Sequence, residues 1–314
     1  MQKRTLGNTG LEVSILSYGA SPLGGVFGDI NGTEGIATVH RALDLGINLL
    51  DCSPYYGLTK AETVLGKALS TVPRESYMLA TKVGRYGDDE FDFSATRVIR
   101  SVDESLKRLQ VEMVDIIQCH DIEFGDLNQI VNETIPALRR VVEAGKARFV
   151  GITGLPLSVF TRVAAQVPID TILSYCRYSL SDSSLETIVP TLREQGIGII
   201  SASPLAMGLL TERGAPDWHP APDSVKAACR RAVEFCQSKG VSIEQLAVQF
   251  AVSNSQIAST LVGTANPKNI EKNAAWAQQP VDEELLAQVR QILAPVRDQT
   301  WRSGRAENND VGAL

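Results

Sequence analysis

Three ionisable side chains stand at the ends of three apolar stretches, where they could act together in acid–base chemistry. Asp51 ends the stretch INLLD, Lys82 ends YMLATK and His120 ends VDIIQCH. Tyr55 and Tyr56, in the Tyr-Tyr-Gly turn after Asp51, add phenols that can give or take a proton. A single such residue is usually a helix cap, a solvated cation or a packed ring. An Asp, a Tyr, a Lys and a His together at neighbouring strand ends indicate a catalytic site.

The stretches that carry these residues belong to a regular alternation of strands and helices. This order is typical of parallel strands joined by crossover helices, and about eight strands favour a closed (β/α)8 TIM barrel. The predicted strands cover residues 13–21, 47–51, 77–82, 114–120, 147–153, 170–176, 196–203 and 258–264. Predicted helices cover residues 34–46, 61–70, 95–110 and 128–145. No linker divides the chain, so we expect one domain over residues 1–314.

The alternation of side chains along a barrel strand tests whether the ionisable residues can all face the interior at the same end of the barrel. Alternate residues face the interior, and catalytic groups lie at the C-terminal strand ends. If each strand-end residue faces inward, so does the residue two positions earlier: Leu49, Ala80 and Gln118. Cys52 and Cys119 then have the opposite parity and are expected to pack under helices.

Three segments fall outside the strand–helix repeat. Residues 4–14 predict a hairpin with a turn at Asn8-Thr9-Gly10, placed as a plug under the barrel. Residues 224–240 predict an extra helix between the last two strands. The tail 300–314 has little apolar content, and we expect either disorder or a flap over one end of the barrel.

The composition restricts the partners of the protein. The chain has 314 residues, 44% hydrophobic and 21% charged, which is an ordinary soluble profile. Its net charge of −6 without a basic stripe argues against nucleic acid, and no apolar run reaches the roughly 20 residues that span a membrane. Five cysteines without CxxC spacing, and no signal peptide, predict reduced thiols in a cytoplasmic protein. No cluster with metal-ligand spacing stands at the strand ends, so no metal is expected. We expect a small-molecule substrate and a monomer or weak homodimer.

The motifs around these residues resemble the aldo-keto reductases. The resemblance lies in DCSPYYGLTKAETVLGKAL, in the Lys that ends YMLATK, in the His that ends VDIIQCH, and in ASPLAMGLLT. With the N-terminal hairpin it spans nearly the whole chain. The family is a (β/α)8 barrel that binds a nicotinamide dinucleotide without a Rossmann domain, and no GxGxxG follows a strand here. The resemblance implies a catalytic tetrad of Asp51, Tyr56, Lys82 and His120. Tyr56 is preferred to Tyr55 because the family's phenol immediately precedes the glycine.

The implied reaction couples hydride transfer to proton transfer on the substrate oxygen. A free tyrosine has a pKa near ~10, too high for a base at neutral pH. An ammonium group about 4 Å away contributes ~4 kcal/mol, or ~3 pKa units, at an effective dielectric near 20. We therefore expect Lys82 to lower the pKa of Tyr56, with Asp51 holding Lys82 and offsetting part of its charge. His120, in its neutral form, is expected to orient the substrate oxygen.

The stretch after the last predicted strand favours NAD as the cofactor. Relatives that prefer NADPH carry a Lys-Ser pair and a later Arg that bind the 2′-phosphate, where this chain has Gly263-Thr264 and Asn269. Charge-assisted bonds are worth ~1.5–3 kcal/mol each, so losing two predicts a preference for NAD of about two orders of magnitude or more. Lys268, next to Asn269, could supply one cation.

Other cofactor contacts are implied by the resemblance alone. They are Ser21, Asp51, Thr153, Ser174, Ser203, Leu205, Gly208 and Asn273. The aromatic residue that often stacks on the nicotinamide is replaced here by Ala202. Tyr175 and Tyr178 are the candidates for its role.

Within the family, SYGASPLGGVFGDI, CHDIEFGD and ASPLAMGLLT resemble the sugar 1-dehydrogenases. This implies oxidation of the C1 hydroxyl of an aldose to a lactone, with L-galactose favoured, as in ascorbate biosynthesis. The expected substrate contacts are Phe27, Tyr56, Arg85, Tyr86, His120, Asp121 and Trp301. Asp121 is equally compatible with a helix cap, and Trp301 with a disordered tail.

Two other functions remain open from the sequence. One is an NADPH-dependent carbonyl or aldehyde reductase of the same family. The other is a cofactor-binding regulatory subunit, because such subunits share the fold and keep the catalytic residues.

Overall fold

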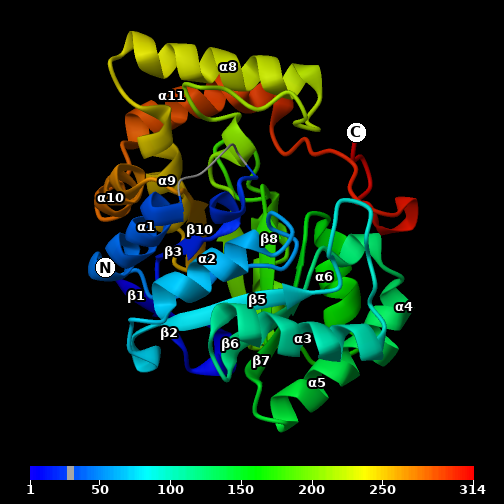
Figure 1. Cartoon of the computed structure of the whole chain (residues 1–314). Coiled ribbons are helices and arrows are strands. Elements are labelled where there is room, and N and C mark those ends of the chain that lie inside the picture. The colour runs from blue at the N-terminus through cyan, green and yellow to red at the C-terminus, as the bar shows by residue number, and fades with distance from the viewer. Residues whose placement is uncertain (27–31) are drawn as a thin grey trace.

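The computed structural model describes residues 1–26 and 32–314, and its centre is a closed barrel of parallel strands (Figure 1). Around the barrel the strands follow the order β10-β3-β4-β5-β6-β7-β8-β9, so each pairs with its neighbour in the sequence and β10 closes the ring. The strands are β3 (Leu16–Gly19), β4 (Leu49–Asp51), β5 (Met78–Val83), β6 (Val114–Cys119), β7 (Ala147–Gly154), β8 (Thr171–Tyr175), β9 (Gly198–Ala202) and β10 (Ser259–Gly263). The predicted (β/α)8 TIM barrel is confirmed.

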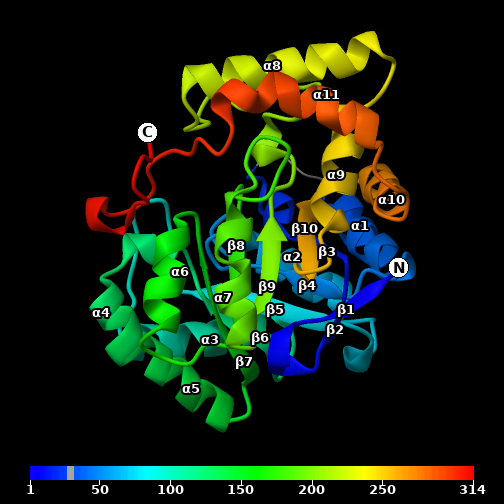
Figure 2. The ribbon, with the colours of Figure 1, turned by 180° about the vertical axis from the view of Figure 1, so that it is seen from behind.

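Helices flank the barrel, and two more cross one end of the molecule. The helices are α1 (Gly32–Asp44), α2 (Lys60–Leu69), α3 (Ala95–Leu109), α4 (Leu127–Gln129), α5 (Ile135–Glu143), α6 (Leu157–Ala164), α7 (Val189–Glu194), α8 (Asp223–Ser238), α9 (Ile243–Ser253), α10 (Pro267–Trp276) and α11 (Glu283–Leu293). Helix α8 is the extra helix predicted over residues 224–240. It lies beside α11 in both ribbon views (Figures 1 and 2).

The N-terminal hairpin plugs one end of the barrel, as predicted. Strands β1 (Lys3–Thr5) and β2 (Glu12–Ser14) pair antiparallel. Leu6, Leu11 and Val13 are buried with the interior residues of the barrel strands. The single strand predicted over residues 13–21 is wrong, because the chain leaves the hairpin sheet after Ser14 and enters the barrel only at Leu16.

The predicted alternation of side chains is confirmed on three consecutive strands. Leu49, Ala80 and Ile116 belong to the apolar cluster inside the barrel. Cys52 and Cys119 belong to the other cluster, between the barrel and its helices. Residues two positions after the interior ones therefore also face inward, at the C-terminal ends of the strands.

The helix predicted over residues 128–145 is interrupted. Helix α4 leads into a π-helical turn over Ile130–Thr134 and then into α5. Pro136 lies at the start of α5, where it has no N–H to donate and its ring crowds the preceding turn. A wider π turn before the proline relieves both problems.

The tail is docked on the barrel, so disorder is ruled out. Leu157 N and Ser158 N each donate to the carboxylate of Asp310 at 2.9 Å. The Asn308 amide donates to the carbonyls of Glu123 at 2.9 Å and Gly125 at 3.0 Å. The tail thus covers the segment that follows β6.

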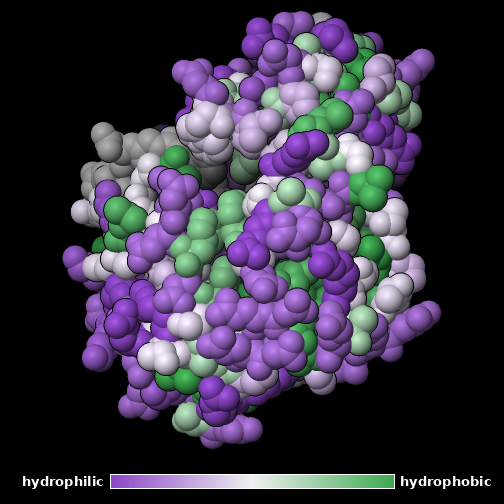
Figure 3. Space-filling view, turned by 90° about the vertical axis from the view of Figure 1, so that its right-hand side faces the viewer, coloured by the Kyte–Doolittle hydropathy of each residue, from purple (hydrophilic) through white to green (hydrophobic). Residues whose placement is uncertain are grey.

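The face shown in Figure 3 is mostly hydrophilic, with hydrophobic residues in small separate patches. Within residues 1–26 and 32–314, no helix is both long and apolar enough to cross a membrane.

Candidate active site

The loop after β4 carries Tyr56 and is held against the loop after β3. Gly57 has a φ of +61°, in the left-handed region that favours glycine. A Cβ at Gly57 would lie 2.1 Å from the carbonyl oxygen of Gly24, and a Cβ at Gly24 would lie 2.6 Å from the backbone of Tyr56. The two loops approach this closely only because both positions are glycine. This contact fixes the backbone next to the phenol.

Lys82 ties three groups together at the mouth of the barrel. It is buried, and its ammonium group donates to Asp51 Oδ1, to the carbonyl of Cys52 at 2.8 Å and to the hydroxyl of Tyr56 at 3.2 Å. These three acceptors match the three donors of the ammonium group. The Tyr56 oxygen thus accepts from Lys82, which leaves the phenolic proton for a substrate.

Asp51 has a second partner that the sequence did not indicate. The Gln118 amide donates to Asp51 Oδ2 at 2.7 Å, and both side chains are buried. Gln118 shares the interior face with His120, so strand parity was the available signal. Burial raises the pKa of Asp51, while the attraction of Lys82 opposes that rise.

The structure contradicts the expected direction of the Tyr56 pKa. Burial of the phenol raises its pKa above the ordinary value near 10, and the charge of Lys82 only partly opposes this rise. The expectation of a lowered pKa considered the charge of Lys82 alone, whereas the buried phenolate also loses its hydration. The negative charge of Asp51 raises the pKa of Tyr56 further. Tyr56 is therefore protonated at neutral pH in this structure.

His120 faces both tyrosines from the end of β6. Its ring is 3% exposed and lies edge-on to Tyr56, with 5.6 Å between ring centroids and an interplanar angle of 89°. Nδ1 lies 3.0 Å from the hydroxyl of Ser53, and Nε2 lies 3.6 Å from Asp121 Oδ2. Burial lowers the pKa of His120 to about 3, so the ring is neutral, as predicted.

One wall beside the tetrad is charged and aromatic. Arg85 forms an ion pair with Asp121 at 2.7 Å and donates to the hydroxyl of Tyr55 at 3.1 Å. Its guanidinium carbon lies 3.9 Å from the centroid of the Tyr55 ring, a cation–π distance. Tyr55 in turn donates to Asp88 at 2.9 Å. Asp121 makes no helix-capping hydrogen bond in the turn that follows it, so its carboxylate serves this wall instead.

The chain is similar to known proteins in sequence and in structure. Residues 15–294 match the aldo/keto reductase family. The chain belongs to that family. It is 52% identical to the L-galactose dehydrogenase of Arabidopsis thaliana, over 98% of this chain and 99% of the relative. It is 29% identical to a D-threo-aldose 1-dehydrogenase of a Pseudomonas species, over 91% of this chain and 97% of that one. Among solved structures, the aldo-keto reductase AKR11C1 of Bacillus halodurans superposes with a TM-score of 0.81 at 25% identity, covering 99% of this chain and 100% of that one.

In this aldo/keto reductase the end of β10 offers a surface for the family's nicotinamide cofactor. Gly263 lies beside Gly19 at the strand ends, and a Cβ at Gly263 would come within 3.0 Å of Pro22. The N-terminus of α10 follows within four residues, at the same end of the barrel as the tetrad, and helix N-termini favour phosphate groups. Gly263 is exposed and lies just before this helix N-terminus, an arrangement that fits the phosphates of a dinucleotide.

The other predicted cofactor residues are distributed unevenly around the mouth. Asn269 is exposed and Asn273 is buried, one turn later on α10, while the carbonyl of Thr264 accepts from Tyr18 at 2.7 Å. The Thr153 hydroxyl lies at the end of β7, where it accepts from the Asp121 N–H at 2.9 Å. Residues in loops after the strands are Ser21, Ser203, Leu205 and Gly208.

Ser174 and Tyr175 have opposite orientations on β8. Leu173 belongs to the interior cluster, so Tyr175 faces inward and Ser174 faces the helices. Tyr175 pairs in register with Ala202 of β9. Tyr178 is buried and stacks on Phe250, with centroids 5.0 Å apart. Of the two aromatic candidates, Tyr175 therefore lies at the mouth and Tyr178 does not.

Two predicted substrate residues are engaged elsewhere. Tyr86 is 7% exposed, its hydroxyl accepts from Gly84 N at 3.1 Å and its ring lies under Arg97 of α3. Trp301 is 8% exposed and packs edge-on against His219, with centroids 5.2 Å apart. Phe27 lies outside the described residues.

Glu123 is a buried carboxyl near the mouth that the sequence analysis missed. Its Oε1 accepts from Ser303 of the tail at 2.9 Å, from Leu155 N at 3.1 Å and from Tyr175 at 3.3 Å. Burial, reinforced by the charge of Asp121, raises the pKa of Glu123 to about 8. No local pattern marks it, because its partners come from distant parts of the chain.

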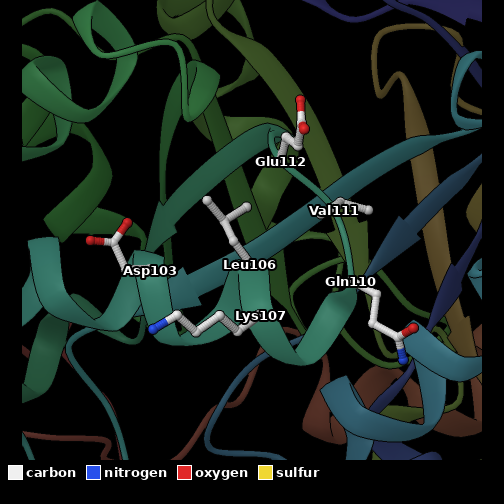
Figure 4. A pocket seen from close by; sticks show the side chains of 6 residues that line it. All are labelled: Asp103, Leu106, Lys107, Gln110, Val111 and Glu112. Atoms are coloured by element: carbon white, nitrogen blue, oxygen red, sulfur yellow. The ribbon is translucent and has the colours of Figure 1, made fainter.

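A surface groove away from the tetrad has no comparable chemistry. Its volume is about 530 Å³, and it lies between the end of α3 and the loop before β6, at the opposite end of the strands (Figure 4). Its lining residues are Asp103, Leu106, Lys107, Gln110, Val111 and Glu112. Among the residues that the structure describes, no group of three or more His, Cys, Asp or Glu side chains could hold a metal ion.

Proposed function

We propose that this aldo/keto reductase oxidises the C1 hydroxyl of an aldose to a lactone, with L-galactose as the favoured sugar and NAD as the oxidant. The single observation that carries the reaction is the contact of 3.2 Å between the Tyr56 hydroxyl and the buried Lys82–Asp51 pair at one mouth of the barrel. The nicotinamide ring, when bound, supplies the hydride acceptor.

The side chains of the tetrad transfer the proton of the C1 hydroxyl. The C1 hydroxyl loses its proton to Tyr56, which must first be ionised. Lys82 stabilises that phenolate, since it already donates to the same oxygen. His120 is neutral and faces the two phenols, so it can orient the reacting oxygen without adding charge. The Arg85–Asp121 wall offers both donors and acceptors to sugar hydroxyls.

The choice of an aldose is supported by the relatives. Two of them are named for oxidation of aldoses at C1, the D-threo-aldose 1-dehydrogenase and a D-arabinose 1-dehydrogenase of Saccharomyces cerevisiae, which is 33% identical over 68% of both chains. The identity of 52% over nearly the whole length favours L-galactose. The product would then be L-galactono-lactone, and the pathway ascorbate biosynthesis.

The choice of NAD is supported by the neutral surface around Gly263. Thr264 and Asn269 provide no positive charge there, and Lys268 is exposed at the start of α10. Of Gly263, Thr264, Asn269 and the neighbouring Lys268, only Lys268 could bring a positive charge to a 2′-phosphate.

We also propose a cytoplasmic protein that is a monomer or a weak homodimer. The five cysteines are buried and free, which suits a reducing compartment. The exposed large apolar side chains among the described residues are few: Leu58, Trp218, Val241, Val311 and Leu314. Sedimentation velocity at several protein concentrations tests the assembly state.

A panel of L- and D-aldoses, assayed with NAD and with NADP by the absorbance of the reduced cofactor, tests the proposal. We expect oxidation confined to L-galactose and close analogues, with NAD preferred by about two orders of magnitude. A flat sugar profile would reject the substrate, and a strong preference for NADP would reject the cofactor.

One observation favours a second function, an NADPH-dependent carbonyl reductase. The raised pKa of Tyr56 keeps the phenol protonated at neutral pH, and a protonated phenol is the acid that reduction needs. Faster reduction of aldehydes with NADPH than oxidation of any aldose with NAD would select this alternative.

A further inference from the structure

We propose that Ser53 is a positioning residue that fixes the tautomer of His120, so that Nδ1 is bare and the ring presents its N–H at Nε2. The inference deepens the proposed function, because it specifies how His120 would meet the oxygen of the sugar. It rests on the hydrogen bonds of two buried side chains.

The starting point is that His120 holds one ring proton. The ring is 3% exposed, and burial lowers its pKa to about 3, although the charge of Asp121 opposes this shift. A neutral imidazole has one donor nitrogen and one acceptor nitrogen, and the neighbours decide which is which.

The hydroxyl of Ser53 has two neighbours within hydrogen-bond distance, and one of them can only donate. The N–H of Tyr55 donates to Ser53 Oγ at 3.1 Å, and His120 Nδ1 lies 3.0 Å from the same oxygen. Ser53 is fully buried. The single proton of the hydroxyl therefore has one acceptor within the described part of the chain, which is Nδ1.

The opposite tautomer would leave a buried donor without a partner. If Nδ1 carried the proton, Ser53 would accept twice, and its own proton would face no acceptor among residues 1–26 and 32–314. An unmade hydrogen bond of a buried hydroxyl is enough to shift the ratio of tautomers by about tenfold or more (~1.4 kcal/mol per factor of ten). The proton is thus placed on Nε2.

In this tautomer the Nε2–H group of His120 is a hydrogen-bond donor at the mouth of the barrel. Nε2 lies on the side of Asp121 but 3.6 Å from its carboxylate, which is too long for a strong hydrogen bond. The Nε2–H group therefore remains able to donate to a substrate oxygen beside Tyr56. Ser53 itself needs no contact with substrate to have this effect.

The chain is well suited to a direct measurement, because it has three histidines. In the full protein labelled with 15N-histidine, multiple-bond proton–nitrogen spectra separate a protonated ring nitrogen from a bare one. His219 provides an internal reference for the same tautomer, since Nε2 lies 3.0 Å from the carbonyl of Ala206 and Nδ1 accepts from Ala221 N at 3.1 Å. The spectrum of His120→Gln assigns the remaining signals.

We expect His120 and His219 to show the same Nε2–H pattern in the parent protein. Ser53→Ala should lower the ratio of Nε2–H to Nδ1–H at His120 by about tenfold, and Ser53→Thr, which keeps the hydroxyl, should restore it. His219 should stay unchanged in both variants. Ser105→Ala is the matched control, because it removes another fully buried serine hydroxyl, on α3, and should leave His120 unaffected.

An Nδ1–H pattern at His120 in the parent protein, or an unchanged ratio in Ser53→Ala, would overturn the proposal. The spectrum of the parent protein tests the predicted tautomer of His120 even if Ser53→Ala does not fold. No sugar or cofactor is present in this measurement, so it can fail or succeed independently of the proposed oxidation. With substrate, Ser53→Ala should lower kcat by about tenfold with less change in KM, and Ser53→Thr should recover it.

Discussion

The two ends of the barrel are built from the same strands but hold different side chains. At the floor, Leu49 and Ala80 meet Leu11 of the N-terminal hairpin in a buried apolar cluster. Two residues further along the same strands, Asp51 and Lys82 form a buried ion pair at the mouth. The apolar floor and the charged mouth are thus only about 7 Å apart along each strand.

The difference shows that stability and chemistry are separated along each strand. The floor gains from burying apolar surface, which is favourable without any precise geometry. The mouth buries charges, and these are tolerated only because every donor of Lys82 has an acceptor. Damage to the floor should therefore reduce stability, and damage to the mouth should reduce activity first.

Tyr56→Phe should have the largest effect on the mouth. Loss of the phenolic proton should lower kcat by about 10²–10⁴-fold, the usual contribution of a positioned acid or base, without loss of NAD binding. Initial rates and a fluorescence titration with NAD measure the two quantities. Tyr55→Phe is the matched control, because Tyr55 bonds Arg85 and Asp88 but not Lys82, and it should cost far less. A rate near that of the parent in Tyr56→Phe would remove the assignment.

Lys82→Met should lower the unfolding free energy as well as the activity. Asp51 would lose its cation and stay buried, which costs about 3–5 kcal/mol of unfolding free energy. Its pKa would rise further, so the folded state would bind a proton more tightly than the unfolded state. The difference in unfolding free energy between the parent and Lys82→Met should therefore become smaller as the pH falls from 7 toward 5. Urea unfolding at both pH values measures it.

The double variant Lys82→Met/Asp51→Asn serves as the control for that interpretation. It removes both charges and should regain much of the lost stability. If the double variant is as unstable as Lys82→Met, the loss comes from packing and not from an unpaired carboxylate.

Leu11→Ala should act on the floor alone. Removing this buried side chain should cost about 2–5 kcal/mol, because the plug cannot fill the cavity left behind. The kcat of the folded enzyme should stay close to that of the parent. Thermal unfolding and initial rates test both statements, and Leu58→Ala, at a site 72% exposed, is the stability control. A large fall in kcat with little loss of stability would contradict the separation of the two ends.

The pH dependence of oxidation should show the smallest but most specific effect. Since the pKa of Tyr56 is raised, the ionised phenol needed as a base is a minor form at neutral pH. The logarithm of kcat/KM for oxidation should rise with pH by about one unit per pH unit and continue to rise to pH 10. A plateau that begins below pH 8 would mean that Lys82 lowers the pKa of Tyr56 after all.

The barrel and the strand-end residues of the tetrad were predictable because they depend on local periodicity. Strands of alternating side chains, separated by helices, specify a parallel barrel. Once Leu49 and Ala80 are interior residues, the parity of the same strands brings Asp51 and Lys82 to one mouth. The third strand of this argument, β6, adds His120 and also Gln118. The same parity puts Gln118 near Asp51, but the bond between them was not predicted.

The remaining features depend on contacts between distant segments. The order of residues along the strands was enough to predict the fold, the apolar floor and the shared mouth of Asp51, Lys82 and His120, whereas the choice of Tyr56 came from the family resemblance. Four features could be read only from the folded chain: the direction of the Tyr56 pKa, the burial of Glu123 under the tail, the packing of Tyr86 and Trp301 away from the site, and the bond from Ser53 to His120. These depend on how much water is removed from a group and on which partners replace it, and neither quantity is encoded in local sequence.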